Sequence, residues 1–177
     1  MEFWPYLRDP ETLARPWAVP GTPGLMHRVG GIEKEDGTGN ISYAPANHSL
    51  MVHLRAAKVA GIANDIPPAT IVGDVDAEVC LLGWGSTWAA IDAAVQRTRR
   101  AGTKVAWIHL THLNPLPPNL GDLLRSFKKV LVPELNLGQL CRMVRAEYLV
   151  DATPISKMQG LPFTSAELEA AIQEALA

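Results

Sequence analysis

The sequence is short of several features that would place it in familiar functional classes. It has only two cysteines, Cys80 and Cys141, which lie far apart and each within an apolar stretch. Small core residues fit that placement better than a disulfide framework or a metal site, and a reducing, cytoplasmic compartment is the default expectation. No apolar run approaches the roughly 20 residues that cross a bilayer. The N-terminal stretch MEFWPYLRDPE is acidic where a secretory signal would be basic, so we expect neither a membrane protein nor an exported one.

An excess of positive charge and a recognisable catalytic set are also lacking. The formal net charge is -2, so no basic field supports a nucleic-acid partner. No Ser/His/Asp or Cys/His set can be assembled from the residue spacings, which leaves a self-contained hydrolase with little support. With 177 residues, 47% of them hydrophobic, the chain has room for one domain and an ordered extension.

The first part of the chain, residues 1–45, is rich in proline, glycine and asparagine and breaks both helix and strand periods. Beyond it, apolar residues at spacings of three and four predict an amphipathic helix over about 46–62. We therefore expect residues 1–75 to form an extended arm with one helix. The arm should pack on its own globular half or on another domain, because buried rings are stabilising and a solvated tail carries few of them. Four aromatic residues, Phe3, Trp4, Tyr6 and Trp17, occur in the first 17 positions of the arm.

The second part, residues 76–177, alternates between strand-like and helix-like patterns. The runs EVCLLGW, KVAWIHL and KVLVPEL are short, apolar and typical of buried strands, and a fourth strand is expected near 152–155. Helical spacings lie between these runs. Strands that alternate with helices predict a three-layer α/β domain, a parallel sheet with helices on both faces, behind a loop-rich N-terminal extension.

The helix boundaries in this half carry typical capping residues, and they predict where each helix begins or ends. A Ser or Asn side chain accepts from the first free N–H groups, and a Thr three residues before a Glu forms a capping box. The residues concerned are Ser86 and Gly102 for the first helix, Asn119 for the second, and Thr164 with Glu167 for the last; the third helix is expected to begin at about Leu137.

The turn Gly83-Trp84-Gly85 follows a strand and opens a helix, which is the place of a dinucleotide-binding loop. The third glycine of that fingerprint is absent, since position 88 is Trp, and a bulky ring there would block close helix packing. A plain tight turn is therefore preferred to nucleotide binding.

Polar side chains follow the predicted strands at the edge where ligands bind in open α/β sheets. A Glu near two His is compatible with a metal, but these three lie on separate strands and in no ligand motif. Capping or interface hydrogen bonding is preferred, with Asn136 as N-cap and Gln139 at the third helical position. The residues at the strand ends are Gly85 and Ser86, His109 and His112, and Glu134 and Asn136.

The segment from His27 to His48 concentrates polar residues among glycines without a secondary-structure period. Binding residues gather on such loops, although a solvated loop held by Asx turns would carry the same composition. We expect it to make inter-domain or inter-subunit contacts, and to be mobile without them. Its candidate contact residues are His27, Arg28, Glu33, Lys34, Asn40, Asn47 and His48.

Four runs of the sequence, in order and over nearly the whole chain, resemble the C-terminal region of the alpha subunit of 2-oxoacid:ferredoxin oxidoreductases of the 2-oxoglutarate type. The runs are PGTPGLMHRVGGIEKEDGTGNISYAPANH, GWGSTWAAIDAAV, HLTHLNPLPPNL and KVLVPELNLGQLCRMVRAEYLVDATPISKMQGLPF. The resemblance implies that the chain from about residue 75 is core domain II, similar in fold to the C-terminal domain of transketolase. It implies that the arm joins this domain to a pyrimidine-binding domain, which the sequence lacks.

The same resemblance implies the chemistry of the complete complex. That family converts a 2-oxoacid and coenzyme A to an acyl-CoA and carbon dioxide with reduction of ferredoxin. It uses thiamine diphosphate with magnesium between alpha and beta subunits, and an iron–sulfur cluster held elsewhere. Two cysteines cannot supply the four thiolates of a cluster. We expect this chain to bind no cofactor or metal, to carry no catalytic residue, and to be inactive alone.

Two hypotheses from different classes follow. In the first, the chain is an assembly domain whose partners are the pyrimidine-binding domain and the beta subunit. In the second, it is an independent small-molecule-binding module that uses the crevice at the strand ends. Exposed aromatic residues in the arm favour the first, and a deep polar pocket near Ser86, His112 and Glu134 would favour the second.

Overall fold

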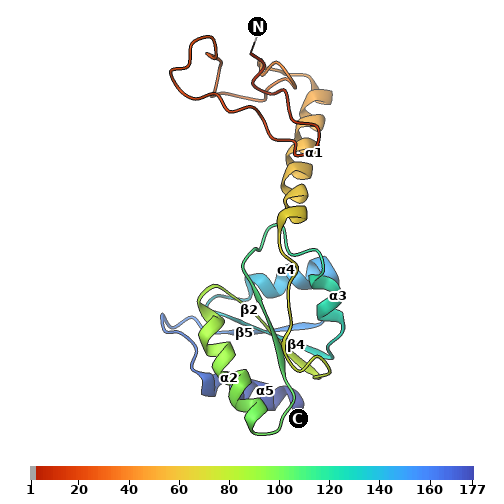
Figure 1. The fold of residues 1–177 in the computed structure, drawn as a ribbon, viewed down its shortest axis with the longest axis vertical. Helices are drawn as coiled ribbons and strands as arrows, with labels where there is room; N and C mark the ends of the chain where they lie inside the picture. The colour runs from red at the N-terminus through yellow and green to blue at the C-terminus, as the bar shows by residue number, and fades with distance from the viewer. Residues whose placement is uncertain (1–2) are drawn as a thin grey trace. The chain divides into compact units, whose positions relative to one another are not determined.

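The computed structural model describes residues 3–177, so Met1 and Glu2 of the acidic N-terminal stretch lie outside the described part. The chain divides into two compact units between Asp65 and Ile66 (Figure 1). The sequence predicts this boundary ten residues later, at 75/76. The structure places residues 66–75 in the second unit, because Ile66 is buried and a short edge strand follows it.

The first unit consists of an irregular arm, helix α1 (Pro45–Gly61) and one 3-10 turn, η1 (Ile62–Asp65). The predicted helix is confirmed, and it begins at a proline, which suits a first turn because its missing N–H would have no partner there. Two isolated β-bridges order the arm, Tyr6 with Gly37 and Lys34 with Ile41. The arm is therefore folded on itself although it contains no extended sheet.

The second unit is built on a five-stranded sheet in the order β1-β3-β2-β4-β5. Four strands run parallel, as the sequence predicts, and β1 is an additional edge strand that pairs antiparallel with β3. A two-residue strand carries no period, so sequence reasoning missed it. The strands are β1 (Val72–Gly73), β2 (Val79–Trp84), β3 (Ala106–Leu110), β4 (Lys129–Glu134) and β5 (Ala152–Ser156).

Helices cover both faces of this sheet and create two apolar cores, which confirms the three-layer architecture (Figure 1). On one face α3 (Leu120–Arg125) and α4 (Gln139–Tyr148) pack on one set of strand residues. On the other, α2 (Trp88–Arg100) and α5 (Ser165–Leu176) pack on the alternate set. Successive strand side chains point to opposite faces, which is why Cys80 lies in one core and Leu81 in the other.

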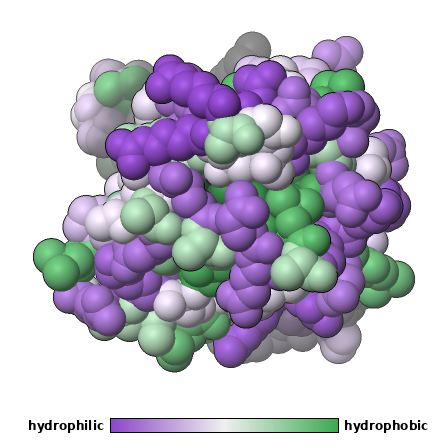
Figure 2. Space-filling model, turned by 90° about the horizontal axis from the view of Figure 1, so that it is seen from below, coloured by the Kyte–Doolittle hydropathy of each residue, from purple (hydrophilic) through white to green (hydrophobic). Residues whose placement is uncertain are grey.

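The end of the second unit that α2 and α5 cover is mostly hydrophilic, with small separate apolar areas (Figure 2). Both helices bury one face and expose charged residues on the other. Within residues 3–177, none of the helices is long and apolar enough to cross a membrane.

The side chains of Ser86 and Asn119 do not cap the helices for which they were expected. Ser86 does not cap α2; the turn η2 (Gly85–Thr87) precedes that helix, and the Thr87 hydroxyl accepts from Trp84 N at 3.2 Å and donates to its carbonyl at 2.8 Å. Asn119 occupies the N-cap position of α3, but its amide bonds both backbone groups of Ala69 at 2.8 and 2.9 Å. The Asn119 amide therefore finds its partners in a neighbouring segment and not in the next helix.

Packing and backbone geometry account for the glycines of the Gly83-Trp84-Gly85 turn. A Cβ on Gly83 would lie 2.3 Å from Ile91 Cδ1, so only glycine lets α2 approach β2 this closely. Gly85 has a φ of +56°, which glycine adopts without strain. These constraints support the interpretation as a plain tight turn.

The predicted capping box at the start of α5 is confirmed. Thr164 Oγ1 accepts from Glu167 N at 3.3 Å, and Glu167 Oε2 accepts from Thr164 N at 2.7 Å. Lys157 Nζ adds two bonds to the same carboxylate at 2.8 and 2.9 Å. Lys157 first, and then Thr164, lower the pKa of Glu167 to about 2.

We predict that the contribution of Glu167 to the free energy of unfolding depends on pH. Because the pKa of this carboxyl falls from 4.5 to about 2 on folding, its contribution is complete above about pH 4.5 and disappears as the pH falls toward 2. Urea unfolding should show Glu167→Gln less stable than wild type at neutral pH, with the difference shrinking across this window. Glu174→Gln, an exposed change on the same helix, is the control. A difference that is constant with pH would contradict the assignment.

Candidate functional site

The carboxyl edge of the sheet is organised by one buried carboxylate, that of Glu134 at the end of β4. Its Oε1 accepts from Leu140 N at 2.9 Å and its Oε2 from Cys141 N at 3.1 Å, both in the first turn of α4. Asn136 Nδ2 and Trp84 Nε1 donate to Oε1 at 3.1 and 3.4 Å. A carboxylate with four donors, two of them at a helix N-terminus, is well satisfied without water.

Asn136 completes the start of α4 from outside the helix. Its Oδ1 accepts from Gly138 N at 2.8 Å and from Gln139 N at 2.9 Å. The expectation that Asn136 is the N-cap with Gln139 at the third helical position is wrong, because Gly138 is the N-cap and Gln139 the first helical residue. Together Glu134 and Asn136 satisfy four consecutive N–H groups, so both polar side chains have a structural role.

The strand-end residues do not converge on a deep pocket. The cavity at this edge has a volume of about 150 Å³, below the roughly 300 Å³ at which ligand pockets begin. Ser86 and Asn136 line it, but His112 and Glu134 do not. His112 is exposed and its Nδ1 lies 3.0 Å from the Thr111 hydroxyl. The full lining is Trp84, Gly85, Ser86, Thr87, Leu135 and Asn136.

His109 is a partly buried residue of β3, and it packs against Trp107 and not against His112. Its Nδ1 is buried and has no hydrogen-bond partner in residues 3–177, and burial lowers the pKa of its imidazole. Its ring packs edge-on against Trp107 at 6.0 Å between centroids. The two histidines and Glu134 are therefore not a ligand set. In the described part of the chain, no three His, Cys, Asp or Glu side chains come together as a metal site would require.

The two cysteines lie in the core, as the sequence predicts. Burial raises the pKa of both thiols, so they stay protonated. Cys141 Sγ donates to the carbonyl of Ala152 at 3.3 Å, and Cys80 is fully buried. Each acts as a small apolar core residue.

In the first unit, the segment His27–His48 is partly fixed by its own helix. Glu33 Oε2 lies 2.6 Å from His48 Nδ1, and Glu33 Oε1 accepts from Arg55 Nη1 at 3.2 Å. His48 first, and then Arg55, lower the pKa of Glu33. Sequence reasoning missed Arg55, although a spacing of seven places it on the same face of α1 as His48.

The side-chain amide of Asn47 holds the same loop by bonding backbone groups of the loop. It accepts from Asp36 N at 3.0 Å and donates to the Lys34 carbonyl at 2.8 Å. Asn47 and His48 belong to α1, so the expectation that this whole segment lacks secondary structure is wrong at its C-terminal end. Arg28 and Asn40 are exposed. A role for these residues in an interface stays a prediction.

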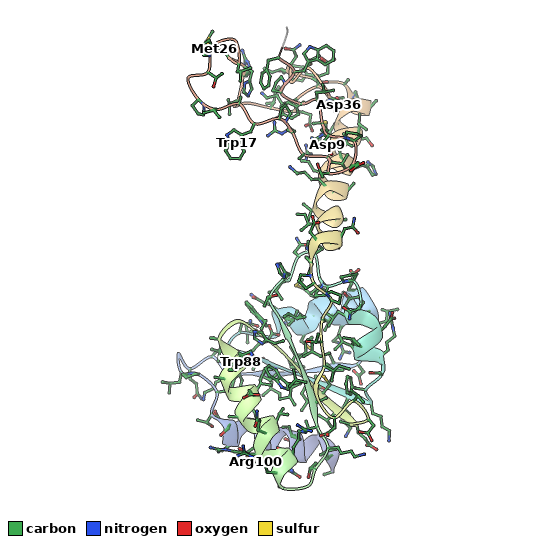
Figure 3. All side chains as sticks on the ribbon, in the orientation of Figure 1. Asp9, Trp17, Met26, Asp36, Trp88 and Arg100 are labelled. Atoms are coloured by element: carbon green, nitrogen blue, oxygen red, sulfur yellow. The ribbon has the colours of Figure 1, made fainter. Side chains whose placement is uncertain are left out.

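The arm exposes large apolar side chains. Trp17 is 88% exposed and Met26 is 95% exposed, and both project from the loop (Figure 3). The other three aromatic residues make contacts inside the unit: the Phe3 ring packs edge-on against His27, Trp4 lies against Gly37, and Arg15 stacks over Tyr6 at 4.3 Å. Exposed arm aromatics combined with a small strand-end cavity favour an assembly role over a binding module.

The fold and this edge define a three-layer α/β domain. Its fold is that of a split-gene transketolase, with a TM-score of 0.51 at 20% identity over 63% of this chain and 42% of the other. The chain belongs to the family of pyruvate:ferredoxin oxidoreductase core domain II, whose family model matches residues 77–168.

Relatives and a solved structure confirm the resemblance to 2-oxoglutarate-type alpha subunits. The chain is 52% identical to 2-oxoglutarate oxidoreductase subunit KorA of Mycobacterium tuberculosis, over 99% of this chain and 27% of the relative. It is 34% identical to subunit alpha of 2-oxoacid:ferredoxin oxidoreductase 1 of Aeropyrum pernix, over 82% and 23%. The chain thus spans about a quarter of the length of these relatives.

The 2-oxoglutarate:ferredoxin oxidoreductase of Magnetococcus marinus, solved with 2-oxoglutarate, coenzyme A and succinyl-CoA bound, is similar to the chain in structure. The TM-score is 0.88 at 32% identity, over 97% of this chain and 30% of that one. Since the similarity includes the arm as well as the α/β unit, the arm is part of the shared architecture.

We predict that Glu134→Ala lowers the free energy of unfolding by about 3 kcal/mol, because two helix N–H groups, an amide and an indole lose their acceptor in a buried site. Glu134→Gln keeps one acceptor oxygen and should lose about half as much. Urea unfolding measures both. Glu147→Ala, which changes an exposed glutamate on α4, should change stability by less than about 0.5 kcal/mol. An equally small effect at Glu134 would contradict its role.

Proposed function

We propose that this chain is the C-terminal region of the alpha subunit of a 2-oxoglutarate:ferredoxin oxidoreductase and that its role is assembly. The observation that carries the proposal is the 52% identity with a 2-oxoglutarate oxidoreductase subunit over 99% of the chain. The complex would oxidatively decarboxylate a 2-oxoacid to an acyl-CoA, with ferredoxin as electron acceptor. The ligands bound in the Magnetococcus marinus structure fit that reaction. Its compartment would be the cytoplasm.

The cofactors that such a complex needs do not fit the residues of this chain. An iron–sulfur cluster takes four thiolates, whereas the two thiols here are buried in the core and protonated. Magnesium with thiamine diphosphate needs converging oxygen ligands, and the strand-end carboxylate of Glu134 is already occupied by four donors. We therefore assign cofactor chemistry to the preceding pyrimidine-binding domain and to the beta subunit.

The surface that would meet those partners is the outer side of the arm. Trp17, Met26 and Tyr43 are each at least 85% exposed, and burying such side chains stabilises an interface by about 1.5 to 3 kcal/mol each. Rings and Met are also the residue types that interfaces favour over the rest of a surface. The end of the α/β unit that α2 and α5 cover is mostly hydrophilic, with small separate apolar areas (Figure 2).

We predict that Trp17→Asp disrupts assembly and leaves the chain folded. The chain would be co-expressed with the remaining part of the alpha subunit and with the beta subunit, and recovered by a tag on the beta subunit. Because a carboxylate would be buried against apolar surface, recovery of the variant should fall by at least about tenfold. The Tm of the isolated chain should not change, since Trp17 is 88% exposed.

Leu161→Asp, an exposed change in the second unit, is the matched control and should be recovered like wild type. Failure of the wild-type chain to co-purify would refute the assembly role. Equal losses in both variants would show that the added charge, and not the position in the arm, is responsible.

A further inference from the structure

A basic pocket lies in the first unit, apart from the exposed side chains that we assign to assembly. It has a volume of about 540 Å³, within the roughly 300 to 1,000 Å³ of small-molecule sites. The arm supplies one side and α1 the other. Its charged lining residues are Arg8, Arg15, Glu33, Lys34, Arg55 and Lys58.

The charges of this pocket are unbalanced. Five of the six charged side chains are cations, and the single carboxylate, Glu33, is already bonded to Arg55 and His48 at 3.2 and 2.6 Å. Within residues 3–177, the remaining four cations have no carboxylate within 4.0 Å: Arg8, Arg15, Lys34 and Lys58. A cleft lined by one sign of charge concentrates counter-ions, so the pocket is suited to an anion.

Two of the cations are held where water cannot satisfy them fully. Lys34 is only 4% exposed, and its Nζ donates to the Gly30 carbonyl at 2.5 Å. Arg8 Nη1 donates to the Leu13 carbonyl at 3.2 Å, but the buried Nε of Arg8 has no partner in the described part of the chain. Burying a cation and a donor without an anion is costly, and a bound anion would offset that cost.

We propose that this pocket binds the phosphate or diphosphate group of a small molecule. Guanidinium groups match phosphate oxygens with a planar fork of donors, and two arginines here are not paired with a carboxylate. The Tyr6 ring, which Arg15 covers at 4.3 Å, and buried Met51 add apolar wall for an organic part. The recessed position of Lys34 suits a small anion better than a carboxylate on a protein surface.

Isothermal titration calorimetry on the 177-residue chain tests this proposal with inorganic diphosphate, ADP and succinate as probes. Saturable binding of diphosphate is expected, weakened by added salt because the interaction is ionic. Equal affinities for ADP and diphosphate would show that the pocket recognises the phosphate groups alone. A higher affinity for ADP would show that the pocket also contacts its organic part. A preference for succinate would overturn the phosphate assignment, as would the absence of saturable binding.

Variants distinguish binding in the pocket from nonspecific attraction of the anion to positive charge elsewhere on the chain. Arg8→Gln and Lys58→Gln should each weaken diphosphate binding by at least about tenfold, because each removes a charged donor. Arg100→Gln, which removes an exposed arginine from α2 in the second unit, should bind like wild type (Figure 3). Unchanged Tm values would show that the variants fold. Equal weakening in all three would overturn the site. The test uses this chain alone, so its outcome is independent of co-purification with other subunits.

Discussion

The second unit depends on the buried carboxylate of Glu134. It ends β4, caps the first turn of α4 and accepts from the indole of Trp84 at the end of β2. These bonds fix β2, β4 and α4 relative to one another at the edge where related folds bind ligands. The carboxylate is fully used in these bonds, and the cavity at this edge is small.

The two units are stabilised in different ways. The α/β unit has an apolar core on each face of its sheet. The first unit has little buried apolar surface beyond Met51 of α1. β-bridges order its arm, and two hydrogen bonds hold the loop against α1: Glu33 accepts from Arg55, and Asn47 donates to the Lys34 carbonyl. Exposed rings on the outside of the arm and unbalanced cations in its pocket both leave binding capacity for other molecules.

Periodic elements could be predicted from the sequence because their signals are local and repeated. The four parallel strands, the long helices and the Thr164–Glu167 capping box all lie where apolar spacing and cap residues indicate. Predictions for single polar residues were less successful. Ser86 and Asn119 have suitable chemistry for caps, yet Thr87 makes the side-chain bonds of the turn before α2, and the Asn119 amide bonds the backbone of Ala69.

The sequence by itself determined the fold class, the family and the buried state of both cysteines, because these follow from periodicity and from long matching runs. Only the tertiary structure decided which polar residues meet. Glu134 bonds α4 and Trp84, His109 and His112 lie apart, and Arg8 and Lys58 line one pocket although they are fifty positions apart in the chain. Such contacts depend on chain reversals and on side-chain direction, and neither leaves a local pattern in the sequence.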